Sequence, residues 1–181
     1  MANHLHNIAL SGEKPQIYVA CLAAYNNGIL YGEWLDATSD VEDIQEHIKQ
    51  LLAKSPMPNA EEFAIHDYSG FGSLIIGEYE GIEQIHEKAL FIVEHGELGA
   101  EVLNYYDGRL ENAQEVLEEY YQGEYKSELD YAIHLFDEIY LHDIPKHAQW
   151  YIDYEKFERD IFNNDYFSLD VCGRCHVFRQ Y

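Results

Sequence analysis

A dense and uneven excess of acidic residues constrains this chain more than any other feature of its sequence. Asp and Glu total 34 against 11 Lys and Arg, a formal net charge of −23 over 181 residues. Residues 61–143 hold 21 of these carboxylates and three bases (Lys88, Arg109 and Lys126), a net charge of −18 in 83 residues. Such a field repels phosphates and attracts basic surfaces. The charge therefore favours a protein partner with a basic groove, and disfavours direct binding to nucleic acid or to anionic membranes.

The size of this charge can be compared with that of DNA. Duplex DNA carries one charge per ~1.7 Å of helix axis, so the net charge corresponds to roughly 40 Å of duplex, and a dimer doubles it. The charge is thus sufficient for a protein that imitates DNA. Many soluble proteins are acidic simply to remain dispersed, however, and charge alone leaves both interpretations open.

The N-terminal part of the chain predicts a small ββαβ unit. Residues 16–25 are rich in β-branched and aromatic residues and predict a strand, and the Asn-Asn-Gly sequence at 26–28 predicts a hairpin leading to a returning strand at 29–35. Ser39 and Glu42 have the spacing of a capping box. Together with apolar residues at helical spacing they predict a helix over 40–54, and a third strand is expected at 63–68.

The middle of the chain predicts helices. Apolar spacing indicates one helix over 82–93, closed by His95-Gly96, and a shorter one over 98–106, closed by Asp107-Gly108. A third is marked by Ala113, Val116, Leu117 and Tyr120 and closes near Gly123.

On this third helix four glutamates follow the spacing i, i+4, i+7 and i+8, which predicts a carboxylate stripe on one face; they are Glu111, Glu115, Glu118 and Glu119. Like charges at i, i+4 repel, and a solvated face normally mixes signs. Because this stripe carries negative charges alone, it favours a role for the negative field in the function of the protein.

The C-terminal part predicts two helices and a hairpin. The helices are expected over 127–140 and 154–162, and the strands over 166–171 and 176–181, joined across Gly173-Arg174. No apolar run is long enough to span a membrane, and no export signal is evident, so we expect a cytoplasmic protein.

One motif has the spacing of a cofactor site. Cys172, Cys175 and His176 match the C-x-x-C-H sequence that attaches c-type haem. The expected hairpin and cytoplasmic location disfavour haem, and structural zinc needs a second ligand pair. The favoured interpretation is that the two cysteines are close by chance, and a zinc site and a redox role stay open as alternatives.

No catalytic constellation is evident elsewhere. His86-Glu87 begins a metalloprotease motif but lacks the second histidine. The Glu83-x-x-His86 spacing of di-iron helices occurs once, where that chemistry needs it twice. We therefore expect no enzymatic activity, no cofactor and no bound metal.

Three blocks of the sequence resemble the ArdA antirestriction proteins. They are residues 15–36 (PQIYVACLAAYNNGILYGEWLD), 61–71 (EEFAIHDYSGF) and 151–160 (YIDYEKFERD), in the family's order. The resemblance extends from about residue 15 to the end of the chain, where His176-Val177-Phe178 is similar to the family's closing strand. It implies a non-enzymatic inhibitor, carried by mobile elements, that imitates bent DNA in the DNA-binding groove of type I restriction–modification enzymes.

The resemblance also implies the architecture. It predicts an α+β fold, an elongated chain of three small domains: an N-terminal domain at 15–75, an acidic helical domain at 76–123 and a C-terminal α+β domain at 124–181. Residues 1–14 lack periodicity and are expected to be a loose leader, longer than the family pattern. The family dimerises through its C-terminal part, and its antirestriction motif aligns loosely with residues 127–140. Ile133 and Phe136 are therefore the predicted contacts of a homodimer.

The predicted partner-binding site is an acidic surface rather than a pocket. We expect it to comprise thirteen carboxylates: Glu83, Glu87, Glu94, Glu97, Glu101, Asp107, Glu111, Glu115, Glu118, Glu119, Glu128, Asp137 and Glu138. The expected partner is the methyltransferase core of a type I enzyme. Two other classes stay open, an acidic adaptor or chaperone for another basic protein and a metalloenzyme that uses Glu and His clusters.

Overall fold

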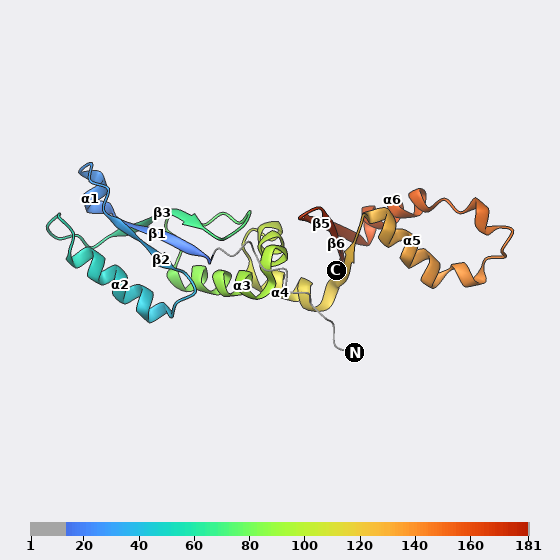
Figure 1. Ribbon diagram of the computed structural model, residues 1–181, viewed down its shortest axis with the longest axis horizontal. Coiled ribbons are helices and arrows are strands. Elements are labelled where there is room, and N and C mark those ends of the chain that lie inside the picture. The colour runs from blue at the N-terminus through green and yellow to red at the C-terminus, as the bar shows by residue number, and fades with distance from the viewer. Residues whose placement is uncertain (1–13, 181) are drawn as a thin grey trace. The chain divides into compact units, whose positions relative to one another are not determined.

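Three antiparallel strands form the first sheet, in the order β2-β1-β3 (Figure 1). The computed structural model describes residues 14–180, so the predicted leader lies outside the described residues except for Lys14. Strand β1 (Gln16–Cys21) is central and pairs with β2 (Gly32–Asp36) and β3 (Phe63–Ser69). Ile17 and Val19 are fully buried, which places the apolar face of the central strand in the core.

The predicted strand over 16–25 is wrong in its second half. The chain leaves the sheet after Cys21 and forms one short helix, α1 (Leu22–Asn26). Its Leu-Ala-Ala start has high helix propensity, and Ala24 is fully buried. The predicted turn at 26–28 is present, with Gly28 at a φ of 77°, and the connection still returns the chain as an antiparallel neighbour.

Helix α2 (Val41–Ala53) packs against β1 and β2 (Figure 1). It buries Ile44, Ile48 and Leu51, the apolar spacing that predicted it. The predicted capping box is wrong. The helix begins one residue later than a Ser39 cap requires, with Asp40 at the N-cap and no side-chain capping bond, so Glu42 lies too early in the first turn to reach back.

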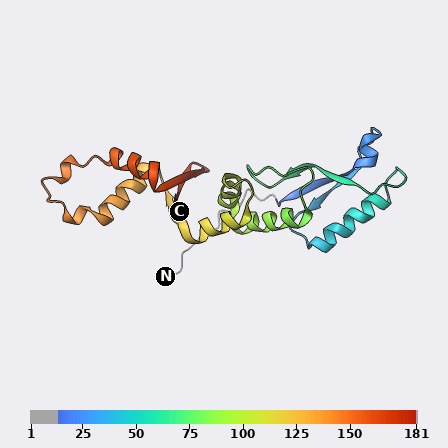
Figure 2. The same cartoon turned by 180° about the vertical axis from the view of Figure 1, so that it is seen from behind.

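Helix α3 (Ile82–Tyr105) is broken at Gly96, where φ is 64° and ψ is −147°. Its two halves run in different directions (Figures 1 and 2). This break confirms the predicted division of the segment at His95-Gly96. Few residues other than glycine adopt this backbone conformation, so the change of direction depends on Gly96.

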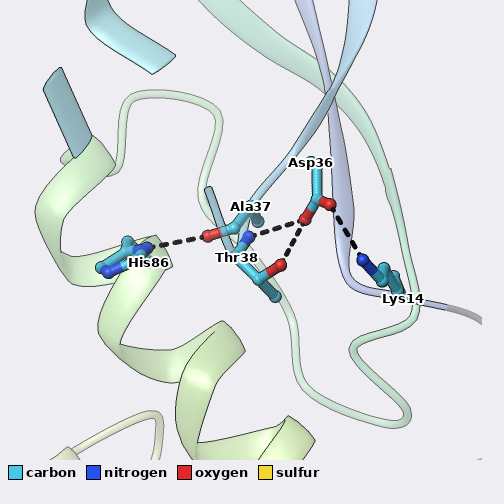
Figure 3. A network of polar contacts seen from close by, with 5 residues as sticks. All are labelled: Lys14, Asp36, Ala37, Thr38 and His86. Carbon is cyan, nitrogen blue, oxygen red and sulfur yellow. Dashed lines mark hydrogen bonds and ion pairs between the residues drawn. The ribbon is translucent and has the colours of Figure 1, made fainter. Parts of the chain in front are cut away.

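A small polar network joins the end of β2 to α3 (Figure 3). The Asp36 carboxylate accepts hydrogen bonds from the Thr38 hydroxyl (2.6 Å) and backbone N–H (2.9 Å), and lies 3.6 Å from the Lys14 Nζ. These groups lower the pKa of Asp36, the Thr38 hydroxyl most of all. The His86 Nδ1 donates to the Ala37 carbonyl at 3.1 Å, which holds the start of α3 against the sheet.

The predicted third helix of the middle region is two shorter elements followed by a strand. They are α4 (Leu110–Glu115), the π-helix η1 (Val116–Tyr120) and β4 (Tyr121–Tyr125). Gly123 lies within the strand, at a φ of 122°, rather than at a helix end. The strand forms because it pairs with β6, which lies about 50 residues later in the sequence. The spacing of apolar residues within 121–125 cannot predict a partner at that distance.

The two C-terminal helices are present as predicted, with small shifts at their ends. Helix α5 (Glu128–Ile139) is capped by Ser127, whose hydroxyl accepts from the Asp130 N–H at 3.1 Å. Helix α6 (Tyr154–Asn164) is capped by Asp153 and runs two residues beyond the predicted end. The helices pack on each other, and two 3₁₀ turns, η2 (Leu141–Asp143) and η3 (Gln149–Tyr151), connect them (Figure 1).

The second sheet has the order β4-β6-β5 and is antiparallel. Strands β5 (Tyr166–Val171) and β6 (Arg174–Arg179) form the predicted hairpin, but its turn is Cys172-Gly173, one residue earlier than expected. Both turn residues have positive φ, 52° and 74°, as a two-residue hairpin turn requires. Val177 joins the core formed with Tyr131, Ala132 and Ile161.

These elements group into two compact units, Met1–Leu110 and Glu111–Tyr181. Each unit has one three-stranded sheet with helices, which confirms the α+β class. The three-domain arrangement is not confirmed, and its predicted boundary at 123 falls inside β4. In the part of the chain that the structure describes, no helix has the length and apolar content needed to cross a membrane.

Candidate acidic interaction surface

The first half of α3 carries a face of three exposed carboxylates, Glu83, Glu87 and Glu94. Their spacing of four and eleven residues is close to one and three helical turns, so the side chains leave the helix in nearly the same direction. At 1.5 Å per residue, Glu94 lies about 16 Å along the axis from Glu83. Glu83 also accepts a 2.7 Å hydrogen bond from the Gln45 amide.

Beyond Gly96 this face does not continue. Glu97 and Glu101 would share it on an unbroken helix, but the break redirects the chain and both residues are half-buried. Asp107 is exposed at the C-terminal end of the segment, 3.5 Å from the Arg109 guanidinium. The structure therefore brings together three of the six acidic residues predicted on this part of the chain and separates the rest.

Lys88, one of the three bases in the acidic stretch, is largely buried. The side chain of Lys88 is only 14% exposed and forms an ion pair with Glu80, which is itself 13% exposed. This pairing cancels both charges locally, so Lys88 does little to offset the carboxylates of α3 around it.

The glutamate stripe opens the second unit. Glu111, Glu115, Glu118 and Glu119 are all exposed, while Ala113, Val116 and Leu117 between them are buried. Within residues 14–180 none of the four glutamates forms a salt bridge. The stripe is not the straight face of one α-helix, because the π-helical turn η1 rotates Glu118 and Glu119 relative to the pair on α4.

Two of the three predicted carboxylates on α5 have structural partners. Glu128 accepts a 2.7 Å hydrogen bond from the Ser168 hydroxyl, and Asp137 accepts one of 2.6 Å from the Tyr154 hydroxyl. The second bond raises the pKa of Tyr154, because the phenol donates to the carboxylate. Both carboxylates are half-buried, whereas Glu138 is exposed.

The two predicted dimer contacts lie in different surroundings. Ile133 is 36% exposed on α5. Phe136 is half-buried, and its ring lies 5.1–5.4 Å from the rings of Tyr140, Tyr154 and Phe157. Phe136 therefore packs α5 against α6, which is a role inside the unit.

The C-x-x-C-H motif lies on the hairpin of the second sheet. Cys172 is exposed in the turn, Cys175 is half-buried on β6, and neither forms a disulfide. His176 is buried, its Nδ1 lies 2.8 Å from the Tyr121 hydroxyl, and burial lowers its pKa, so the ring packs as a neutral core group. Among the described residues, no group of three His, Cys, Asp or Glu side chains is placed to hold a metal ion.

Sequence reasoning missed one surface feature in the first unit. Trp34 is 46% exposed and its ring centroid lies 5.6 Å from that of Tyr18. The alternation of Gly32, Trp34 and Asp36 on one side of β2 is the signal that would have placed the tryptophan outside the core.

Comparison with known families gives a match over most of the chain. A family model described as antirestriction protein (ArdA) matches residues 17–172, which is most of the chain and includes all thirteen carboxylates. A comparison with curated proteins finds no match.

Proposed function

This chain belongs to the ArdA antirestriction family, and from that membership we propose that it occupies the DNA-binding groove of type I restriction–modification enzymes as an acidic mimic of DNA. The family is one of inhibitor proteins rather than enzymes. The proposed action is to keep DNA out of the groove and thereby to protect incoming mobile DNA from restriction.

The observation that carries the proposal is a set of exposed carboxylates without neutralising partners. Six of the thirteen, on α3, α4 and η1, are exposed and form no ion pair or hydrogen bond within residues 14–180: Glu87, Glu94, Glu111, Glu115, Glu118 and Glu119. Free carboxylates attract a cationic groove in the way that phosphates do. This supports an electrostatic competitor of DNA.

The proposal has a consequence for specificity. Contacts to the phosphate backbone position a protein on DNA, whereas contacts to base edges read the sequence. A mimic that presents charge without bases should therefore inhibit enzymes with different recognition sequences to a similar extent. Its affinity should fall as salt rises, because the contacts are between charged surfaces.

We further propose that the protein acts in the cytoplasm as a homodimer with three small domains along each chain. Of the two predicted dimer residues, the exposed Ile133 is the better supported contact, because Phe136 already packs within its own unit. A homodimer would double the charge presented to a groove.

Competition for a type I methyltransferase core holding labelled duplex DNA tests the proposal directly. The protein is titrated into the complex at two salt concentrations. We expect displacement at near-stoichiometric protein, weakening as salt rises. If the folded protein displaces no DNA at either concentration, the alternative of an acidic adaptor or chaperone for another basic protein takes its place.

A further inference from the structure

Within residues 14–180, the two faces of the first sheet are buried to different extents. Helix α2 packs on the face that carries Ile17 and Val19, both fully buried. Alternate residues of the same strands point the other way. On that second face Tyr18 is half-buried and Trp34 is 46% exposed, so an aromatic pair lies at the surface of unit 1.

The strand register places a carboxylate beside the two rings. Tyr18 is opposite Trp34 on one side and opposite Asp67 on the other, so the three side chains form one row across the sheet. The ring centroids of Tyr18 and Trp34 are 5.6 Å apart with planes tilted by 57°. Asp67 is exposed, and its Oδ1 accepts a 2.8 Å hydrogen bond from the Tyr68 N–H, which limits the motion of the side chain.

A glycine in the next row makes room for this arrangement. A Cβ built on Gly32 would lie 2.9 Å from the Tyr18 ring. The absence of a side chain on Gly32 lets the Tyr18 ring lie over the strand rather than stand away from it. Because the two ring planes are tilted by 57°, a flat cation can lie parallel to one ring and touch the other.

We propose that this face binds arginine side chains of a basic protein partner, with the guanidinium stacked on Tyr18, in contact with Trp34 and paired with Asp67. Arginine is planar and stacks on aromatic faces, whereas lysine is a compact, strongly hydrated point charge. The charge of the unit fits such a partner, since residues 1–110 contain 18 carboxylates and five bases. The inference deepens the proposed function and rests on it for the identity of the partner, a restriction enzyme.

This contact differs in kind from those expected of the exposed carboxylates on α3 in the first unit and on α4 and η1 in the second. A stripe of carboxylates attracts lysine and arginine alike and weakens uniformly with salt. A guanidinium stacked on a ring adds binding free energy that depends on the shape of the cation. This contribution is reduced less by moderate salt than that of exposed ion pairs. The sheet face therefore predicts a preference for arginine over lysine at equal charge.

The test uses the full-length chain with labelled tetra-arginine and tetra-lysine peptides as probes, followed by fluorescence anisotropy at matched salt. We expect the wild-type protein to bind the arginine peptide about threefold to fivefold more tightly than the lysine peptide. The Trp34→Ala variant should lose this preference. Trp150→Ala is the matched control, because Trp150 is 90% exposed in the other unit and its removal should leave the preference intact.

A second variant keeps the test decisive if Trp34→Ala disturbs the sheet. In Asp67→Asn the amide oxygen can still accept from the Tyr68 N–H, while the charge is removed, so the fold is expected to be retained and the arginine preference to shrink. Emission of Trp34, read in a Trp150→Phe background, should change on addition of the arginine peptide and not of the lysine peptide.

Equal binding of the two peptides by the wild-type protein overturns the inference, as does a preference that both variants retain. A change in sedimentation between wild type and Trp34→Ala would instead assign the face to a second copy of the chain, and would likewise overturn it. Failure of the proposed function gives a different pattern: no displacement of DNA from the methyltransferase core, with the arginine preference intact.

Discussion

Neutralising the glutamate stripe at the start of the second unit should weaken inhibition far more than any single change within it. The perturbation is Glu→Gln at all four positions, Glu111, Glu115, Glu118 and Glu119, which preserves side-chain size. An exposed ion pair contributes about 0.2–1 kcal/mol. Four lost pairs therefore amount to about 1–4 kcal/mol, a weakening of roughly fourfold to several hundredfold, whereas one lost pair gives at most about fivefold.

The same substitutions should not harm the fold. None of the four side chains forms a salt bridge in the described part of the chain, and all are exposed. Glu111 and Glu115 repel each other at i, i+4 on α4, so removing that repulsion should stabilise the unit by about 0.2–0.5 kcal/mol. The quadruple variant should thus inhibit less while its urea unfolding midpoint stays level or rises slightly.

The assay is displacement of labelled duplex DNA from a methyltransferase core, measured for the quadruple variant, the four single variants and a control of equal charge. The control replaces four exposed carboxylates elsewhere in the same unit by their amides: Asp143, Glu155, Asp160 and Asp165. If the control weakens displacement as much as the stripe variant does, inhibition depends on net charge alone and the four stripe glutamates have no specific role in binding. If one single variant abolishes displacement while folded, the distributed picture is refuted.

Substituting Gly96 with Ala should lower the free energy of unfolding of the first unit by about 1–3 kcal/mol in urea, because its backbone conformation is open to few other residues. Burial lowers the pKa of His176 in the folded protein, so below pH 6.5 the unfolded chain binds more protons than the folded one. The free energy of unfolding should therefore fall as the pH drops from 6.5 toward the folded pKa. Urea unfolding measured across this pH range should show a weaker dependence of stability on pH for His176→Gln than for the wild type. Ile133→Asp should shift sedimentation toward the monomer without loss of stability. Phe136→Ala should instead lower stability, by up to about 3 kcal/mol, because its ring packs α5 against α6.

Local patterns in the sequence were enough to predict most of the elements. The spacing of Ile44 and Ile48 predicted α2, and the serine at 127 lies where a helix cap is observed. His95-Gly96 predicted the break in α3 because a glycine that follows an apolar helical run is the usual end of a helix. Each of these signals is contained within a few residues, which is why sequence alone reveals them.

The elements that were missed depend on distant partners or on finer geometry. Strand β4 exists because Tyr121 and Tyr125 pair with residues of β6 that lie fifty or more positions later. The short helix at Leu22–Asn26 interrupts a stretch whose composition favours a strand, and the backbone N–H of Leu22 donates to the carbonyl of Glu62, forty residues later and next to β3. The π-helix at Val116–Tyr120 has the same apolar spacing as an α-helix and differs only in its hydrogen bonds.

The sequence was enough to predict which part of the chain is acidic, but not how its carboxylates are arranged in space. Charge counting found the acidic stretch, whereas the common face of Glu83, Glu87 and Glu94 on α3 emerges only from the structure. Spacing cannot report side-chain partners, so it grouped Glu128 and Asp137 with residues that face solvent, although both accept hydrogen bonds within their own unit.

The order of strands in the second sheet has a consequence for how the protein is made. Its central strand, β6, is the last of the described elements to leave the ribosome, although its neighbour β4 is translated about 50 residues earlier. At 5–20 residues per second, β4 waits roughly 2–10 s for its partner, while every strand of the first unit has already been translated. During that interval the first unit can fold on the nascent chain and the second cannot. A nascent chain arrested before Arg174 would expose the unpaired edges of both β4 and β5 to aggregation and to proteases.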